Sequence, residues 1–340
     1  MVETLQTAMA RETLDAPEVV ARMLRDAAPA IADVGKLFRL RKPSHIITSA
    51  RGSSDHAAHY MKVLCEILLG LPCASVGASV VSIYQRPLAL HDCIVVAISQ
   101  SGASPDSLAF AAESKRAGVP LVSITNVPGS ALAGLADVAI ELGAGPEQSV
   151  AATKTFIASV AMAARIVAAW AEDMAFSAAF DTLPVALAKA NQMRWPTMEA
   201  VAARARSAFV LGRGPSLAMA GEAALKLKET AGVHAEAYSS AEVIHGPMAL
   251  IEPGFPVMMF APDDAAYATN LATAERLRAA GADVHMVSRT GGLDYAATGH
   301  ALLDPISIIQ SFYGSAERIA RARGKDPDRP KLLSKVTKTL

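Results

Sequence analysis

The chain has 340 residues, of which 52% are hydrophobic and 19% are charged. This length is enough for two ordinary domains, each with its own core. The 32 lysine and arginine residues balance the 32 aspartate and glutamate residues, so nothing in the composition points to nucleic acid or a charged membrane surface as a partner. We therefore expect a globular protein that binds neither.

The N-terminal segment 1–34 is predicted to be helical and amphipathic, with Pro17 near the start of a second helix. Its opening sequence MVETLQTAMARE contains acids and no apolar core, so it does not resemble a signal peptide. Residues 156–171 form the most apolar long stretch, but they include Arg165 and are fewer than the roughly 20 residues that a membrane span needs. The three cysteines lie in apolar surroundings without metal-ligand spacing. We expect a buried helix at 156–171 and a cytoplasmic protein.

Strand-like and helix-like segments alternate after this helical start. The strands are continuous apolar runs, which are typical of a parallel sheet with helices on both faces. The predicted fold class is therefore α/β, with three layers in the order α/β/α. The expected strands are residues 45–50, 73–78, 93–99, 120–125 and 137–142, and the expected helices are residues 53–70 and 104–118.

The same order of motifs returns in the second half of the chain. The Arg-Gly pair that begins at Arg51 recurs at Arg213. Two further matches, Pro87 with Pro247 and Gly118 with Gly281, have almost the same separation in sequence. Matches in one order at nearly one spacing indicate a tandem duplication of an α/β domain. The predicted boundaries are a helical segment 1–34, a first domain 35–180, a second domain 197–325 and a C-terminal tail 326–340, with the linker at 181–196.

The stretch AISQSGASPDSL, residues 97–108, places several hydroxyl side chains where a buried strand ends. Ser104 stands in the N-cap position before Pro105, and helix N-termini bind anions. A second serine-rich strand–turn–helix lies in SARGSSDHAA, and ligands of parallel sheets bind beyond the carboxyl ends of the strands. Ordinary caps and serine turns are the alternative. Because the chain has neither a Walker lysine nor GxGxxG, we favour a monophosphate on a small metabolite over a nucleotide.

In the second copy ISQSG is replaced by FAPDD, so the predicted phosphate site belongs to the first copy only. The second copy contains GEAALKLKETAG, where Glu222, Lys226 and Glu229 fall at i, i+4 and i+7 on one helix face. A carboxylate on a rigid helix suits proton transfer between C1 and C2 of an open-chain sugar phosphate. A solvated, salt-bridged face is the alternative.

His245 lies in EVIHGPM, and a pKa near neutrality would let it protonate a ring oxygen. Glu242 precedes it by three positions and is a candidate to orient it. His234 is a weaker candidate and Lys335 lies in a basic tail, so a structural or solvated role is the alternative for each. No His/Cys/Asp cluster has metal spacing, and we expect neither a metal nor an organic cofactor.

The quoted turns are similar to the signature of the sugar isomerase (SIS) domain. Residues 211–257, LGRGPSLAMAGEAALKLKETAGVHAEAYSSAEVIHGPMALIEPGFPV, resemble the isomerase part of glucosamine-6-phosphate synthase. The motifs RGSSDHA and SQSGASPD look most like those of stand-alone SIS-type glucosamine-6-phosphate deaminases. The resemblance implies two tandem SIS domains. No nucleophile cysteine follows Met1 and the chain is short, so we expect no counterpart of the synthase's glutaminase domain.

The resemblance also implies roles for single residues. Phosphate binding is implied for Ser54, Ser99, Gln100, Ser101 and Ser104, with Gly52 and Ser53 shaping the same pocket. Sugar contacts are implied for the backbone of Val150, with Arg51 and Glu242 nearby. Catalytic roles are implied for Glu229 as the enolisation base, Lys226 one turn before it, His245 as the ring-opening group from the neighbouring subunit, and Lys335 as the lysine that reaches the sugar carbonyl. Two residues depart from the synthase, because Arg51 replaces a cysteine and Ala152 replaces a serine.

These roles imply an enzyme that converts glucosamine 6-phosphate to fructose 6-phosphate and ammonia, by ring opening, C1/C2 proton transfer and imine hydrolysis. A deglycase or an aldose–ketose isomerase on another phosphosugar, such as fructosamine 6-phosphate or galactosamine 6-phosphate, is an alternative, as is the ammonia-dependent synthase direction. A non-catalytic phosphosugar sensor is a further alternative, although segment 1–35 contains no basic cluster for a DNA-binding domain. We also expect a symmetric homodimer with shared active sites, because the apolar helix at 156–176 is predicted to meet a partner and because the resemblance implies that His245 completes the neighbour's site.

Overall fold

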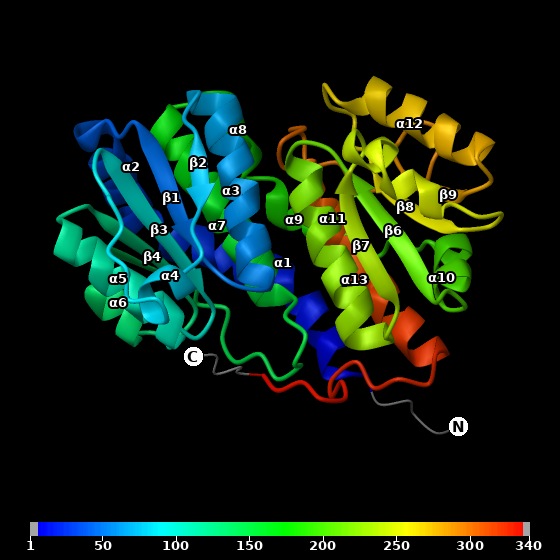
Figure 1. Cartoon of the computed structure of the whole chain (residues 1–340), viewed down its shortest axis with the longest axis horizontal. Coiled ribbons are helices and arrows are strands. Elements are labelled where there is room, and N and C mark those ends of the chain that lie inside the picture. Colours follow the sequence, from blue (N-terminus) through cyan, green and yellow to red (C-terminus); the bar gives the residue numbers. More distant parts are fainter. Residues whose placement is uncertain (1–5, 336–340) are drawn as a thin grey trace. The chain divides into compact units, whose positions relative to one another are not determined.

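The computed structural model describes residues 6–335, and the chain divides into two compact units. The first unit contains Glu18–Glu147 and Lys154–Phe180. The second unit contains residues 6–17, Gln148–Thr153 and Asp181–Lys335. Each unit is built on its own parallel sheet with helices beside it (Figure 1), so the predicted α/β fold class is confirmed.

The sheet of the first unit has five parallel strands in the order β2-β1-β3-β4-β5. Its strands are β1 (His45–Ser49), β2 (Cys73–Ser75), β3 (Cys93–Ser99), β4 (Leu121–Thr125) and β5 (Val138–Glu141). The helices are α2 (Ala28–Arg41), α3 (Ser53–Leu69), α4 (Ser79–Ser82), α5 (Pro105–Ala117), α6 (Ala131–Leu135), α7 (Lys154–Ala171) and α8 (Met174–Ala179). One group of helices, α2, α3 and α7, packs together, and α5 packs with α4 and α6. The three cysteines are free and buried, as the sequence predicts.

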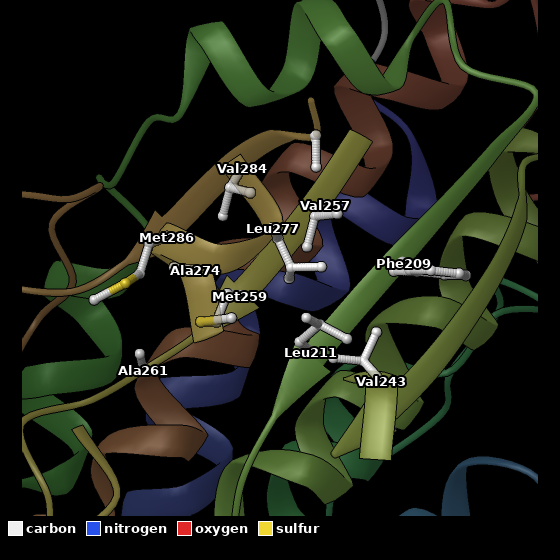
Figure 2. Close-up of a cluster of buried hydrophobic side chains, with 11 residues drawn as sticks. Phe209, Leu211, Val243, Val257, Met259, Ala261, Ala274, Leu277, Val284 and Met286 are labelled. Carbon is white, nitrogen blue, oxygen red and sulfur yellow. The ribbon is translucent and has the colours of Figure 1, made fainter. Parts of the chain in front are cut away.

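The sheet of the second unit has four parallel strands in the order β7-β6-β8-β9. Its strands are β6 (Ser207–Gly212), β7 (His234–Ser239), β8 (Pro256–Phe260) and β9 (Asp283–Val287). The helices are α9 (Leu183–Ala190), α10 (Pro196–Ala202), α11 (Pro215–Lys226), α12 (Tyr267–Ala279) and α13 (Asp304–Ala322), and the first part of α1 (Ala8–Asp26) also belongs to this unit. Figure 2 shows one of its apolar clusters, in which side chains of β6, β8 and β9 meet Ala274 and Leu277 of α12.

The tandem duplication is visible in the backbone. Gly52 precedes α3 with φ 57° and ψ −132°, and Gly214 precedes α11 with φ 57° and ψ −131°. A positive φ with this ψ is accessible to glycine and strained for other residues, which explains why glycine stands at this position in both copies. The strand order β7-β6-β8-β9 also repeats the order β2-β1-β3-β4.

Helix α7 lies within the core of the first unit. By length and composition this one helix, among residues 6–335, is apolar enough to cross a membrane, but 83% of the window is buried within the structure. It packs against α2 and α3, as a core helix does. The burial predicted for this helix is therefore confirmed. The argument that its apolar surface needs a partner subunit is wrong, because the chain's own helices cover it.

Candidate functional site

The serine-rich turn after β3 has a tight backbone shape. The Ser99 Oγ accepts a hydrogen bond from the Gly102 N–H at 3.2 Å, and the Ser101 Oγ accepts one from the Ala103 N–H at 3.3 Å. Gly102 has φ +59°, and a Cβ at this position would lie 2.2 Å from the Ser130 Oγ. The turn thus requires glycine, and it holds the hydroxyls of Ser99 and Ser101 beside the start of α5.

Ser104 occupies the N-cap position of α5, as predicted, in an extended conformation with φ −64° and ψ 125°. Its side chain makes no capping hydrogen bond. The first N–H groups of a helix lack partners within the helix and attract anions. The Ser104 hydroxyl does not accept a hydrogen bond from these N–H groups. An anionic ligand at this helix end could therefore bind to both the N–H groups and the hydroxyl.

Arg51 joins the two turns that the sequence predicts as a phosphate site. It follows β1, and its Nη2 donates to the buried carboxylate of Asp106 in the first turn of α5. The other oxygen of Asp106 accepts a hydrogen bond from the Ser82 hydroxyl. Ser53 and Ser54 begin α3 directly after Gly52. The structure therefore ties the start of α3 to the start of α5, at the carboxyl edge of the sheet.

A cavity of about 360 Å³ lies beside this turn, at the carboxyl ends of β1 and β2. Arg51, Gly52, Asp55 and Ser75 are among the residues that line it. Burial raises the pKa of the Asp55 carboxyl, although the nearby His59 and the Ser75 hydroxyl act in the opposite direction. The cavity is large enough for a small polar group next to the predicted phosphate position.

In the second unit, Glu229 lies on a π-helical turn. Helix α11 ends at Lys226, and the turn Leu227–Ala231 continues it with π-helical hydrogen bonding. The sequence spacing predicts a regular helix face here, and the structure differs by this one turn. Such π turns are rare and occur often at functional sites.

Lys226 is the centre of a buried charge cluster. Its Nζ lies 2.5 Å from the Glu229 Oε2 and 3.4 Å from the Glu222 Oε1. The side chains of Lys226 and Glu222 are 1% and 0% exposed, whereas that of Glu229 is 23% exposed. Burial opposes the charge on Lys226, but the two carboxylates outweigh it, so the pKa of Lys226 is raised. The cluster thus presents one carboxylate, that of Glu229, toward solvent and holds it with a charged lysine.

Tyr313 completes this cluster from α13, and no sequence motif indicated it. Its hydroxyl donates to the Glu222 Oε1 at 3.0 Å. Sequence reasoning missed this residue because 91 positions separate the two partners and no periodic pattern links them.

The histidine loop is solvent-exposed in the single chain. His245 and Glu242 are the last and first residues of the 3-10 helix Glu242–His245, and both are exposed. Within residues 6–335 no hydrogen bond or ion pair joins them, so the structure does not support the expectation that Glu242 orients His245. His234 begins β7, where its side chain is 74% exposed and 3.9 Å from Glu236.

Lys335 lies beside the segment that contains Val150. Its Nζ donates to the Ser149 carbonyl oxygen at 2.7 Å. The Ser149 N–H donates to the Glu12 carboxylate at 3.1 Å, and the Val150 N–H donates to the Asp328 carbonyl oxygen at 3.3 Å. Two predicted sugar-contacting positions far apart in the sequence are therefore neighbours in the second unit. Residues 336–340 of the predicted tail lie outside the described residues.

The predicted residues thus form two groups. The phosphate-turn residues and Arg51 belong to the first unit, and the groups around Glu229, His245 and Lys335 belong to the second unit. In the first unit Arg51 contacts the first turn of α5. In the second unit Lys226 contacts Glu229, and Lys335 lies beside the segment of Val150.

Comparison with known proteins identifies the family. The sequence model of the SIS domain matches residues 39–169 and 203–294. The chain belongs to the SIS domain family. Among its SIS relatives is a glutamine–fructose-6-phosphate aminotransferase (isomerizing) from Aeropyrum pernix, which is 35% identical over 91% of this chain and 52% of that protein. The chain spans about half the length of the curated relatives that it matches.

Solved structures of SIS proteins agree with this assignment. A protein from Silicibacter pomeroyi DSS-3, provisionally named a phosphosugar isomerase, is 47% identical with a TM-score of 0.90, covering 95% of this chain and 100% of that one. Glucosamine-6-phosphate deaminase from Thermotoga maritima is 20% identical with a TM-score of 0.74, covering 98% of this chain and 100% of that one. The latter likeness shows the shared fold alone.

Proposed function

We propose that this SIS protein is an amino-sugar-phosphate deaminase/isomerase. It converts glucosamine 6-phosphate and water to fructose 6-phosphate and ammonia. The observation that carries the proposal is the partly exposed Glu229 carboxylate, which the buried Lys226 holds at 2.5 Å on a π-helical turn. A surface salt bridge needs neither a fully buried lysine nor an irregular turn, whereas a base that must reach two adjacent carbons benefits from both.

The proposal assigns one step to each group. The serine-rich turns of the first unit hold the phosphate, so binding energy away from the reacting carbons fixes the orientation of the sugar. His245, from a neighbouring subunit of a homodimer, helps to open the ring, and Lys335 acts near the carbonyl. Glu229 takes the proton from C2 and returns it to C1, which turns the aldose amine into a ketose imine. Water then adds at C2 and ammonia leaves.

The positive charge of Lys226 suits this role. A lysine whose pKa is raised stays protonated in the neutral range, so its ammonium group can hold the Glu229 carboxylate in place at 2.5 Å. The names of the relatives support the substrate class, because the curated matches include fructose-6-phosphate aminotransferases. We further propose that the enzyme acts in the cytoplasm, without a metal or an organic cofactor.

Arg51 favours a second candidate within the same family. It replaces the cysteine expected from the synthase and is held by Asp106 beside the cavity of about 360 Å³. A guanidinium in place of a thiol changes the groups that a bound phosphosugar would meet at this rim. The alternative is therefore a deglycase or isomerase that acts on fructosamine 6-phosphate or galactosamine 6-phosphate, or an ammonia-dependent synthase.

A parallel assay distinguishes these functions. Ammonia release is measured with glucosamine 6-phosphate and galactosamine 6-phosphate, release of hexose 6-phosphate is measured with fructosamine 6-phosphates, and the isomerase and synthase activities are measured as conversion of fructose 6-phosphate without and with added ammonia. The Glu229→Gln protein is the blank in each assay. We expect turnover of glucosamine 6-phosphate to be the fastest. If only another of these compounds is turned over, the proposed substrate is wrong but the proposed mechanism stands. If fructose 6-phosphate raises the melting temperature but no substrate is turned over, the protein is a phosphosugar sensor and the proposed enzyme activity is wrong.

A further inference from the structure

A second cavity lies in the second unit, apart from every residue assigned above. Its volume is about 300 Å³, and residues of α1, α13 and the end of α9 line it. Helices α9 and α13 pack against each other. Thr13, Gln310 and the arginines 194, 318 and 321 are among the lining residues. The volume lies at the lower end of the range for small-molecule sites, and the wall is polar.

The charges of the wall are not balanced. Arg318 donates two hydrogen bonds to the Glu199 carboxylate, at 2.9 and 2.5 Å, and Arg321 lies 3.7 Å from Glu317. The Nη1 of Arg194 donates instead to the carbonyl oxygens of Asn191 and Met193, at 3.1 and 2.9 Å. Across residues 6–335 no acidic side chain pairs with Arg194. One guanidinium at this cavity therefore keeps an uncompensated positive charge.

The wall also contains a buried acceptor without a donor. Gln310 is fully buried, and its Nε2 donates to the Thr13 carbonyl oxygen and to the Asn191 Oδ1, both at 2.7 Å. These two acceptors fix the orientation of the amide, so the remaining atom is the acceptor Oε1. In the described part of the chain, Oε1 has no hydrogen-bond partner. A buried acceptor of this kind costs about 1–3 kcal/mol unless a donor reaches it.

We propose that this cavity is a second binding site, for a small hydroxylated anion. The acidic group of the ligand, a phosphate or a carboxylate, pairs with Arg194. A hydroxyl or N–H of the ligand supplies the donor that the Gln310 Oε1 lacks, directly or through a bound water. Arginine suits such a group because its planar fork binds phosphate and carboxylate oxygens in pairs.

The cavity is connected to the segment of Val150 and Lys335 through α1. Thr13 and Leu14 of α1 line the cavity, and the neighbouring Glu12 carboxylate accepts hydrogen bonds from the N–H groups of Gln148 and Ser149. The carbonyl oxygen of Ser149 in turn accepts from Lys335. If the proposed function holds, a ligand in this cavity regulates the enzyme by shifting α1 and with it the backbone near the sugar.

Binding tests the site independently of turnover. The probes are glycerol 3-phosphate and glycerate, titrated calorimetrically into the full-length chain that carries Ser101→Ala and Ser104→Ala, which weaken the first site. We expect saturable binding of at least one probe, weakened at least tenfold by Arg194→Ser. Arg204→Ser is the matched control, because Arg204 is an exposed arginine of the same unit outside the cavity, and it should leave binding unchanged.

Each outcome decides the proposal. Binding of one probe alone supports the site and identifies the acidic group. The absence of saturable binding of both probes up to about 10 mM, or binding that Arg194→Ser leaves intact, overturns it. Gln310→Met is expected to weaken binding as well, and because Arg194 is exposed, its variant remains informative if Gln310→Met fails to fold. The Glu12→Gln protein should still bind the probe, but the probe should no longer change its KM. Only this KM measurement depends on the proposed function.

Discussion

The hydroxyl of Tyr313 on α13 donates a hydrogen bond to the Glu222 Oε1 on α11 over 3.0 Å, with both side chains fully buried. Glu222 in turn faces the Lys226 Nζ at 3.4 Å. Lys226, which holds Glu229, is thus positioned through Glu222 by a contact from α13, a helix far away in the sequence.

Tyr313→Phe removes this donor and keeps the ring. We expect kcat to fall about threefold to tenfold with KM unchanged, because Glu222 can then turn away from Lys226. The loss of a hydrogen bond to a charged group should also lower the free energy of unfolding by about 1–2 kcal/mol. Steady-state kinetics and thermal melting check both effects. Wild-type kcat in a correctly folded variant would show that the contact does not position the base.

Glu229→Gln should abolish turnover while phosphosugar binding survives. The amide has the shape of the carboxylate but cannot accept the proton, so we expect kcat to fall by about 10²–10⁴-fold. Binding of fructose 6-phosphate is measured by calorimetry. Glu275→Gln is the control, since Glu275 is an exposed acid on α12. Lost binding with retained turnover would reverse the assigned roles.

Ser104→Ala should weaken phosphate binding without destabilising α5. An ordinary N-cap serine costs about 0.5–2 kcal/mol when it is replaced by alanine, but the Ser104 side chain makes no capping bond. We therefore expect an unchanged melting temperature and a KM raised about tenfold. Asp173→Ala gives the opposite control, because Asp173 caps α8 by accepting from the Phe176 N–H at 2.9 Å. It should lower the melting temperature and leave KM alone. A destabilised Ser104→Ala protein with normal KM would assign Ser104 to capping.

A mixture of two inactive variants tests the shared active site. Glu229→Gln and His245→Ala should each be nearly inactive. If His245 acts in the neighbouring subunit, subunit exchange places both changes in one site and restores the other site of each heterodimer. Activity should then recover substantially. Native mass spectrometry shows whether the subunits exchange. If they exchange and the mixture stays inactive, Glu229 and His245 act within one chain.

Glu199 should make the second unit sensitive to acid. Burial acts to raise the pKa of its carboxyl, but hydrogen bonds from Arg318 and Ser315 and the charge of Arg318 outweigh this, so the pKa lies below the ordinary value of 4.5. Its stabilising effect is therefore complete above pH 4.5 and is lost as the pH falls through the lowered pKa. We expect Glu199→Gln to lower the free energy of unfolding by about 1–3 kcal/mol at pH 7, with a smaller difference below about pH 4. Thermal melting of both proteins between pH 3 and 8 measures this, and a difference that grows toward low pH would contradict it.

The regular parts of the fold were predictable because they repeat. Alternating strands and helices, and the Arg-Gly pair that occurs at Arg51 and again at Arg213, indicate the duplicated α/β domain. The spacing of Glu222, Lys226 and Glu229 predicts a common helix face, and the structure has these side chains in contact. The π turn at Leu227–Ala231 was not predictable, because its residues have ordinary helix propensities.

Long-range contacts could not be predicted from the sequence, for a physical reason. The bond from Tyr313 to Glu222 and the bond from Ser149 to Glu12 join residues 91 and 137 positions apart. Only tertiary packing brings such pairs together, and neither has a motif. The apolar circumference of α7 was interpreted as a partner surface for a related reason, since hydrophobic composition does not distinguish a neighbouring helix of the same chain from one of another chain.

The second unit is assembled from three separate stretches: residues 6–17, Gln148–Thr153 and Asp181–Lys335. The second unit thus includes two stretches that precede the second copy of the repeat in the sequence. A genetic crossover between relatives at residues 181–196 would join a second copy to foreign versions of the two other stretches, including Glu12 and the backbone of Ser149. Contacts that cross the junction, such as those from Lys335 to the Ser149 carbonyl oxygen and from Gln310 to the Thr13 carbonyl oxygen, would then have to form between sequences from two different proteins.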